Sequence, residues 1–168
     1  MEKVTCWVID VNERICIKEI FDDFSKVAIQ IVESGKEHIN IMFGKKNNNI
    51  QPLVLNFKNN DEERKKAILI VRKMFHNAEW VIHISEGWLI KRKLKGRIER
   101  PSKAKDRKEC LNIMLHTSDG FNISRTYLIK ERKKGGLIKE DETEGHNIVS
   151  IWSPYLKKQL SINRDKTI

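Results

Sequence analysis

The chain has 168 residues, of which 39% are hydrophobic and 33% are charged. This length fits one domain around one hydrophobic core, and the apolar content excludes a disordered chain. Its 33 Lys and Arg residues outnumber its 23 Asp and Glu residues, so the formal net charge is +10 at pH 7. Such a balance predicts attraction to polyanions and says nothing about the fold.

Three cysteines, Cys6, Cys16 and Cys110, are far apart and form no C-x-x-C pair. The odd number and the spacing argue against a disulfide framework and against a cysteine zinc site, so we expect a reducing compartment. The chain shows no signal-peptide pattern, and no apolar run approaches the roughly 18 residues of a membrane-spanning helix. We therefore expect a cytoplasmic protein without a membrane partner.

The first third of the chain predicts a helix followed by a β-hairpin. Residues 4–9 alternate loosely and predict either a strand or the lead-in to a helix. Apolar residues then recur at three-and-four spacing over 13–34, and Gly35 is a typical helix stop. Residues 38–43 and 53–57 read as strands, joined by a Gly- and Asn-containing turn over 44–49.

The middle of the chain predicts a second amphipathic helix and a broken strand. Asn60 and Glu63 resemble a capping box at the start of a helix that runs to about His76. Residues 80–84 are apolar and β-branched, and a second apolar patch at 88–90 follows Ser85-Glu86-Gly87. This interruption predicts a bulge or a turn.

The last third predicts further antiparallel strands. In chain order we expect a basic connection over 91–108, a hairpin of 110–116 and 123–129 turning at 118–120, a mobile Gly- and acid-rich loop over 135–145, a strand over 146–152 and the start of a short helix at 153–154. The sheet is therefore expected to be mostly antiparallel.

These elements predict an α+β fold in which two long amphipathic helices pack on one face of a mostly antiparallel sheet. A strand over 4–9 would complete a ferredoxin-like βαββαβ core. We expect one domain over 1–152, with 153–168 as a short C-terminal extension. No internal repeat is present.

The densest positive segment of the chain is the connection over 91–108. A tryptophan beside such a segment would combine a stacking surface with positive charge, as single-stranded nucleic-acid binders do. The predicted nucleic-acid-binding residues are Trp88, Lys91, Arg92, Lys95, Arg97, Arg100, Lys105 and Arg107. Two other interpretations stay open: a solvated basic loop with Trp88 in the core, and a surface that docks on an acidic protein.

Carboxylates and an arginine recur at the predicted strand ends, and they suggest a different class of function. The candidate catalytic residues are Glu86, Asp106, Glu109 and Arg132. If they converge, two carboxylates and an arginine would suit metal-assisted or acid/base attack on a phosphate ester. The alternative is that these carboxylates are ion-pair partners that hold the basic loop in place.

The residues S-E-G-W at 85–88, followed by P-S-K-A-K-D-R-K-E at 101–109, resemble a pattern of small uncharacterised bacterial and phage proteins. The resemblance covers roughly residues 79–132. It implies a Ser-Glu-x-Trp at the end of one strand and a Ser-x-x-x-Asp-Arg-x-Glu that leads into another. It supports kinship of fold and brings no activity, and this chain has Gly87 within the pattern.

Motifs for cofactors and for covalent chemistry are lacking in the sequence. It contains no G-x-x-x-x-G-K-[ST], G-x-G-x-x-G, G-x-S-x-G or H-E-x-x-H pattern, so we predict neither a cofactor nor a metal site. His83 and Glu86, three residues apart, are the one local pair that suggests metal binding. The leading hypothesis is a nucleic-acid or polyanion binding module, the alternatives are a metal-assisted phosphoesterase or an interaction protein, and the oligomeric state stays open.

Overall fold

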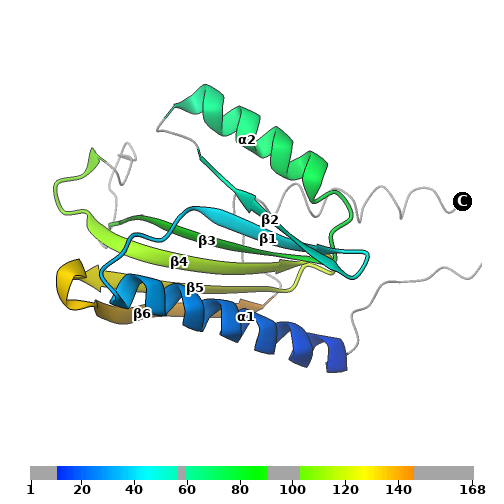
Figure 1. Cartoon of the computed structure of the whole chain (residues 1–168), viewed down its shortest axis with the longest axis horizontal. Coiled ribbons are helices and arrows are strands. Elements are labelled where there is room, and N and C mark those ends of the chain that lie inside the picture. The colour runs from blue at the N-terminus through cyan, green and yellow to red at the C-terminus, as the bar shows by residue number, and fades with distance from the viewer. Residues whose placement is uncertain (1–10, 57–59, 91–102, 146–168) are drawn as a thin grey trace, which may run out of the picture.

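The computed structural model describes residues 11–56, 60–90 and 103–145. Two α-helices, one short 3-10 helix and six strands occupy these residues (Figure 1). Along the chain they are α1 (Val11–Glu33), β1 (Ile41–Lys46), β2 (Asn49–Val54), α2 (Asp61–Met74), β3 (Trp80–Leu89), β4 (Lys108–Thr117), β5 (Asn122–Lys130), η2 (Arg132–Lys134) and β6 (Gly136–Gly145). The strands predicted over 4–9 and 146–152, and the extension over 153–168, lie outside the described residues.

The strands form one six-stranded sheet in the order β2-β1-β3-β4-β5-β6, and every neighbouring pair is antiparallel. The predicted α+β class and the antiparallel sheet are confirmed. The ferredoxin-like core is not confirmed, because its first strand was expected over 4–9. Beyond β3 the sheet continues through three further antiparallel strands.

The two helices lie on opposite faces of the sheet, and the prediction of a shared face is wrong (Figure 1). Ile82 of β3 belongs to the core cluster of α1, together with Phe21, whereas Val81 belongs to the cluster of α2, together with Phe75. Successive side chains of a strand point to opposite faces, so these two clusters are separated by the sheet. Amphipathic spacing shows that a helix has an apolar face and leaves open which side of the sheet it covers.

The β1–β2 hairpin turns more tightly than its sequence suggested. Asn47 and Asn48 both have positive φ, 50° and 62°, and Lys46 pairs with Asn49 across a two-residue turn. Asn tolerates this left-handed backbone conformation, which two-residue hairpin turns require. Gly44, expected in the turn, lies within β1, and a Cβ there would come within 2.3 Å of the Phe75 ring. It allows α2 to pack closely on the strand.

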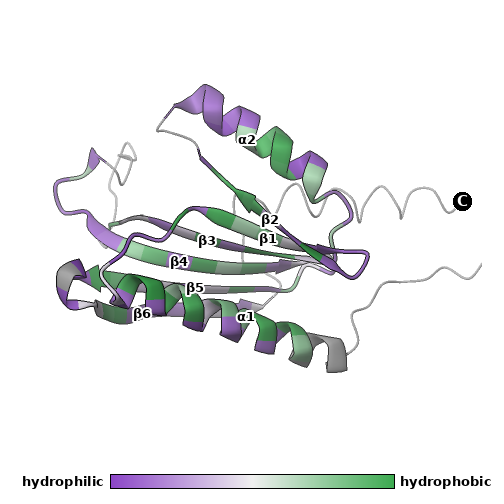
Figure 2. Cartoon of the chain, viewed as in Figure 1, coloured by the Kyte–Doolittle hydropathy of each residue, from purple (hydrophilic) through white to green (hydrophobic). Residues whose placement is uncertain are grey.

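Two later segments also differ from expectation. β3 runs without a break from Trp80 to Leu89, and Gly87 pairs in register with Cys110, so no bulge lies at 85–87. The Gly- and acid-rich segment expected as a loop over 135–145 forms β6, an edge strand paired with β5. Charged side chains protect an edge from further pairing, so their abundance there is compatible with a strand. The first turns of α2 are also hydrophilic (Figure 2).

Candidate nucleic-acid interface

Several segments meet at one end of the sheet, where β3 ends and β4 begins. Leu89 pairs with Lys108 at this end, and on the other side of β4 the strand β5 ends at Lys130, which pairs with Gly136 of β6. The chain after α1 reaches the same place, because the Lys36 carbonyl accepts a hydrogen bond from Arg132. We call residues 36–38, 86–89, 103–109 and 130–136 the charged sheet end.

Trp88 is the large aromatic side chain of this end, and it is 41% exposed. It lies next to the last residue of β3, where it pairs in register with Glu109. The guanidinium carbon of Arg107 lies 4.3 Å from the centre of the Trp88 ring, within the range of a cation–π contact. The interpretation of Trp88 as a core residue is therefore wrong, and an aromatic surface lies beside a cation.

The exposed charges at this end of the sheet are mainly positive, and two of the bases, Lys108 and Lys130, point to the face opposite to Trp88. Seven exposed bases belong to the charged sheet end: Lys36, Lys103, Lys105, Arg107, Lys108, Lys130 and Lys134. The exposed acids of the same segments are Glu37, Asp106 and Glu131, and Glu131 forms an ion pair with Lys134. Clustered charge of one sign raises the local concentration of oppositely charged ligands.

Three of the four candidate catalytic residues converge here in one ion-pair cluster. Arg132 donates to both oxygens of Glu86, at 3.1 Å from Nη1 and 2.5 Å from Nη2, and its Nη2 lies 3.0 Å from Glu109. The backbone amide of His38 donates to Glu86 Oε1 at 2.6 Å. Hydrogen bonds to Glu86 raise the pKa of Arg132. The cluster thus joins β3, β4, η2 and the segment after α1.

Local backbone geometry explains how Arg132 reaches this position. Glu131 has a left-handed backbone, with φ of 49°, and Gly135 closes the 3-10 turn with φ of 68°. A Cβ on Gly135 would lie 2.3 Å from the Glu33 carbonyl oxygen, so glycine permits the turn to pack against the end of α1. The contacts of Arg132 and Glu86 with the backbone of 36–38 have no signal in the sequence.

The remaining predicted residues have mixed outcomes. Asp106 is exposed in the loop before β4 and lies between Lys105 and Arg107, which are exposed as well. The other predicted nucleic-acid-binding residues, Lys91, Arg92, Lys95, Arg97 and Arg100, lie outside the described residues.

The His83 and Glu86 pair that suggested metal binding does not form. The two residues are three positions apart in an unbroken strand, so their side chains point to opposite faces of the sheet. His83 instead contacts Asn40, at 2.7 Å from its Nε2, and it is buried on the α2 side. Within residues 11–56, 60–90 and 103–145, no three His, Cys, Asp or Glu side chains are grouped to hold a metal ion.

No family model, curated protein or solved structure matches the chain. The resemblance over 79–132 therefore stays a prediction. Neither of the two described α-helices is both long and apolar enough to cross a membrane.

Proposed function

We propose that the protein binds single-stranded nucleic acid at the charged sheet end, with Trp88 stacking on an unpaired base. The observation that carries this proposal is the exposed Trp88 ring with the Arg107 guanidinium 4.3 Å from its centre. Every nucleobase has a π-face, so an exposed aromatic ring binds single strands with little sequence preference. The lysine and arginine side chains around Trp88 would contact the phosphates.

The burial of the other tryptophan of the described sheet supports this interpretation of Trp88. Trp80, at the opposite end of β3, is 1% exposed and belongs to the core on the α1 side. Trp88 lies on the same face of the same strand, eight residues later, and keeps a large part of its surface in solvent. An exposed large aromatic side chain loses the stability that burial would bring, which fits a role in binding.

The enzymatic alternative, a metal-assisted phosphoesterase, is less well supported by the geometry. Arg132 forms ion pairs with Glu86 and Glu109, and Glu86 also accepts a backbone amide. These contacts occupy both oxygens of Glu86 and one oxygen of Glu109, which would otherwise bind a metal or take a proton. Because the cluster joins four segments, its role in stabilising this end of the sheet is sufficient to explain it.

The test is a salt titration of binding to a fluorescein-labelled 15-mer of deoxythymidine, followed by fluorescence anisotropy. We expect Trp88→Leu to weaken binding about 5- to 150-fold, because stacking contributes about 1–3 kcal/mol per base. We expect the double variant Lys103→Gln/Lys105→Gln to weaken binding and to reduce the slope against log salt by up to about 1.4, at about 0.7 per phosphate contact.

The matched control is Lys65→Gln/Lys66→Gln, two exposed lysines of α2. Both double variants remove two lysines and so lower the net charge from +10 to +8. If both double variants weakened binding equally, the binding would be non-specific attraction by the net charge. Unchanged affinity of Trp88→Leu would refute the stacking role, and tighter binding to poly-glutamate than to the oligonucleotide would favour the acidic-protein alternative.

A further inference from the structure

Trp88 has a carboxylate as its direct neighbour in the sheet. It pairs in register with Glu109 of β4, and both side chains point to the α1 face, as do Ile82 and Leu111 of the same strands. The Cβ atoms of directly opposite residues in an antiparallel pair lie about 4.5–5.5 Å apart. Glu109 is therefore close enough to contact the edge of a nucleobase that stacks on Trp88.

Glu109 has one oxygen that is not occupied by the ion-pair cluster. Its Oε1 lies 3.0 Å from Arg132 Nη2, whereas its Oε2 has no hydrogen bond or ion pair with the residues that the structure describes. The Glu109 side chain is 36% exposed, against 14% for Glu86, whose two oxygens both accept from Arg132. Of these two carboxylates, Glu109 is the one that can accept a hydrogen bond from a ligand.

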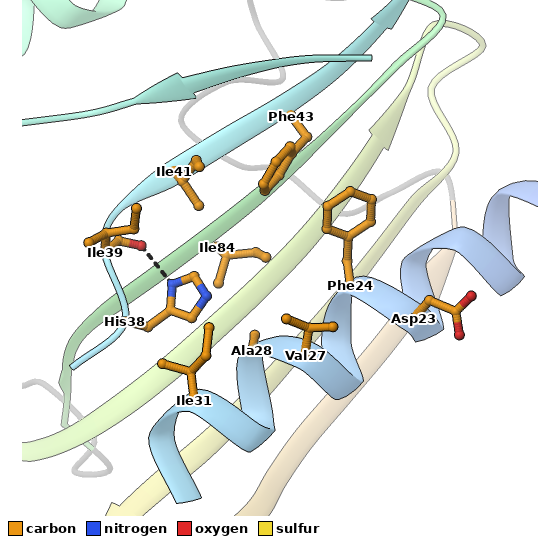
Figure 3. A pocket seen from close by; sticks show the side chains of 10 residues that line it. All are labelled: Asp23, Phe24, Val27, Ala28, Ile31, His38, Ile39, Ile41, Phe43 and Ile84. Atoms are coloured by element: carbon orange, nitrogen blue, oxygen red, sulfur yellow. Dashed lines mark hydrogen bonds between the residues drawn. The ribbon is translucent and has the colours of Figure 1, made fainter. Parts of the chain in front are cut away.

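The cluster holds Glu109 in position before a ligand arrives. Arg132 is itself held by Glu86, which also accepts from the backbone amide of His38. The ring of His38 bonds the Ile39 carbonyl through Nδ1, at 2.7 Å, so this residue is bonded through both its backbone and its side chain (Figure 3). A group that is already held in place loses less conformational freedom when it binds a ligand.

Among the nucleobases, guanine is the best match to a carboxylate. Its Watson–Crick edge presents two neighbouring donors, N1–H and N2–H, and an ionised carboxylate only accepts hydrogen bonds. Adenine and cytosine have a ring acceptor next to their amino group, and thymine has a carbonyl on each side of N3–H. These acceptors would face the carboxylate oxygens. Hydrogen bonds to an ionised acceptor are also stronger than those between neutral groups.

The charges around Trp88 favour different parts of a nucleotide. The carboxylate of Glu109 repels a phosphate, whereas the Arg107 guanidinium, 4.3 Å from the centre of the Trp88 ring, attracts one. Lys103 and Lys105 are exposed in the same loop as Arg107. A strand whose phosphates follow this loop can therefore direct the polar edge of a nucleobase toward Glu109.

The apolar hollow between α1 and β1 is less suited to a nucleobase (Figure 3). It lies where α1, whose ion pairs run to β5 and β6, leaves the β1 side of the sheet uncovered. Phe24, Val27 and Phe43 line it with other apolar side chains, and its polar lining residues are Asp23 and His38. The polar edge of a nucleobase would lose its hydrogen bonds to water against such a wall.

We propose that the site selects guanine, which stacks on Trp88 and donates from N1–H and N2–H to the carboxylate of Glu109. Glu109 Oε1 can accept from guanine and from Arg132 together, because each carboxylate oxygen has two lone-pair sites. This inference rests on the proposed binding of single strands and adds a nucleobase preference to it. Glu109 is then the residue that determines the specificity.

The experiment compares fluorescein-labelled pentamers of deoxythymidine in which the central nucleobase is guanine, hypoxanthine or adenine. Fluorescence anisotropy at low salt measures their affinities. We expect guanine to bind about 5- to 150-fold more tightly than adenine, which has the same fused rings for stacking, as one bidentate contact predicts. Hypoxanthine keeps N1–H and lacks the N2 amine, so its affinity should lie between the two. Equal affinities for guanine and adenine would overturn the proposal.

The variant Glu109→Gln tests the assignment of the preference to this side chain. Gln replaces one acceptor oxygen by an amide, so we expect the ratio of guanine to adenine affinity to fall to about one, with circular dichroism as the check of folding. The matched control is Glu37→Gln, an exposed acid of the charged sheet end that removes the same charge. It should strengthen binding to all pentamers alike and keep the ratio. A ratio retained in Glu109→Gln, or lost equally in the control, would overturn the proposal.

The deoxythymidine 15-mer separates this inference from the proposed function. A chain that binds the 15-mer through Trp88 and shows no preference for guanine would contradict the role of Glu109 alone. A chain that binds none of the oligonucleotides would contradict the proposed function together with this inference.

Discussion

At the scale of single residues, Arg132 is the side chain with the most connections at the charged sheet end. It binds both oxygens of Glu86, one oxygen of Glu109 and the Lys36 carbonyl. Both Arg132 and Glu86 are mostly buried, whereas Glu109 is more exposed. A carboxylate left behind without its cation costs more free energy where it is shielded from water.

We therefore expect a graded series of stability losses in this cluster. Arg132→Met should lower the free energy of unfolding by about 3 kcal/mol, because it leaves two carboxylates together without their cation. Glu109→Gln should cost less than about 1 kcal/mol, since this pair is partly solvated. Urea unfolding monitored by circular dichroism measures both changes. Equal small losses would indicate that the cluster does not stabilise the fold.

At the scale of elements, close approach between α2 and β1 depends on one glycine. Gly44 lies under the Phe75 ring, where an added Cβ would be only 2.3 Å from the nearest ring carbon. Gly87, within β3, has space instead: the nearest atom to an added Cβ is Asn112 Nδ2, 3.6 Å away. Neither glycine has the positive φ that would itself require this residue. The two positions thus differ in packing and share their backbone state.

This difference predicts opposite responses to the same substitution. Gly44→Ala should destabilise the fold by about 1–3 kcal/mol, because α2 must shift away from β1. Gly87→Ala should be neutral or stabilise by up to about 1 kcal/mol, because alanine has less freedom in the unfolded chain. Thermal and urea unfolding of the two variants provide the comparison. Similar losses at both positions would contradict the role assigned to Phe75.

At the scale of the whole molecule, two buried histidines couple stability to pH. His83 and His116 are 7% and 2% exposed, on the face opposite to α1. Burial lowers the pKa of His83 to about 4, with a further contribution from His116, and burial also lowers the pKa of His116. Asn122, which bonds His116 Nδ1 at 2.6 Å, opposes the second shift. The native state therefore holds both rings neutral.

Stability should consequently fall as the pH decreases from about 6.5 toward 4. Over this range the unfolded chain binds protons that the native histidines do not, so protonation favours the unfolded state. For His83 alone the loss amounts to about 3 kcal/mol. Urea unfolding at pH 7.5, 6 and 5 measures the slope, and His83→Asn should make it shallower. A slope unchanged by that substitution would assign the pH dependence to other groups.

Local patterns in the sequence were sufficient to predict most elements and part of the site. Apolar spacing predicted α1, the Asn60 cap predicted α2, and the turn at 118–120 predicted the hairpin of β4 and β5. The recurrence of carboxylates and arginine suggested Glu86, Asp106, Glu109 and Arg132 as a set whose convergence depended on the strand order, and the structure brings Glu86, Glu109 and Arg132 together without Asp106. The helices and the hairpin depend on interactions between residues close in the chain. The ion-pair cluster forms because opposite charges attract one another where strand ends meet.

Only the tertiary structure decided the side of the sheet that each helix covers, the continuity of β3 and the pairing of β6. Gly87 and the acidic residues of 136–145 disfavour a strand locally, and the hydrogen bonds of the neighbouring strands outweigh that preference. The hollow beside Val27 likewise arises from how far α1 extends across its face of the sheet. The periodicity of apolar residues indicates which face of an element is buried. Which element packs on that face depends on contacts between distant parts of the chain.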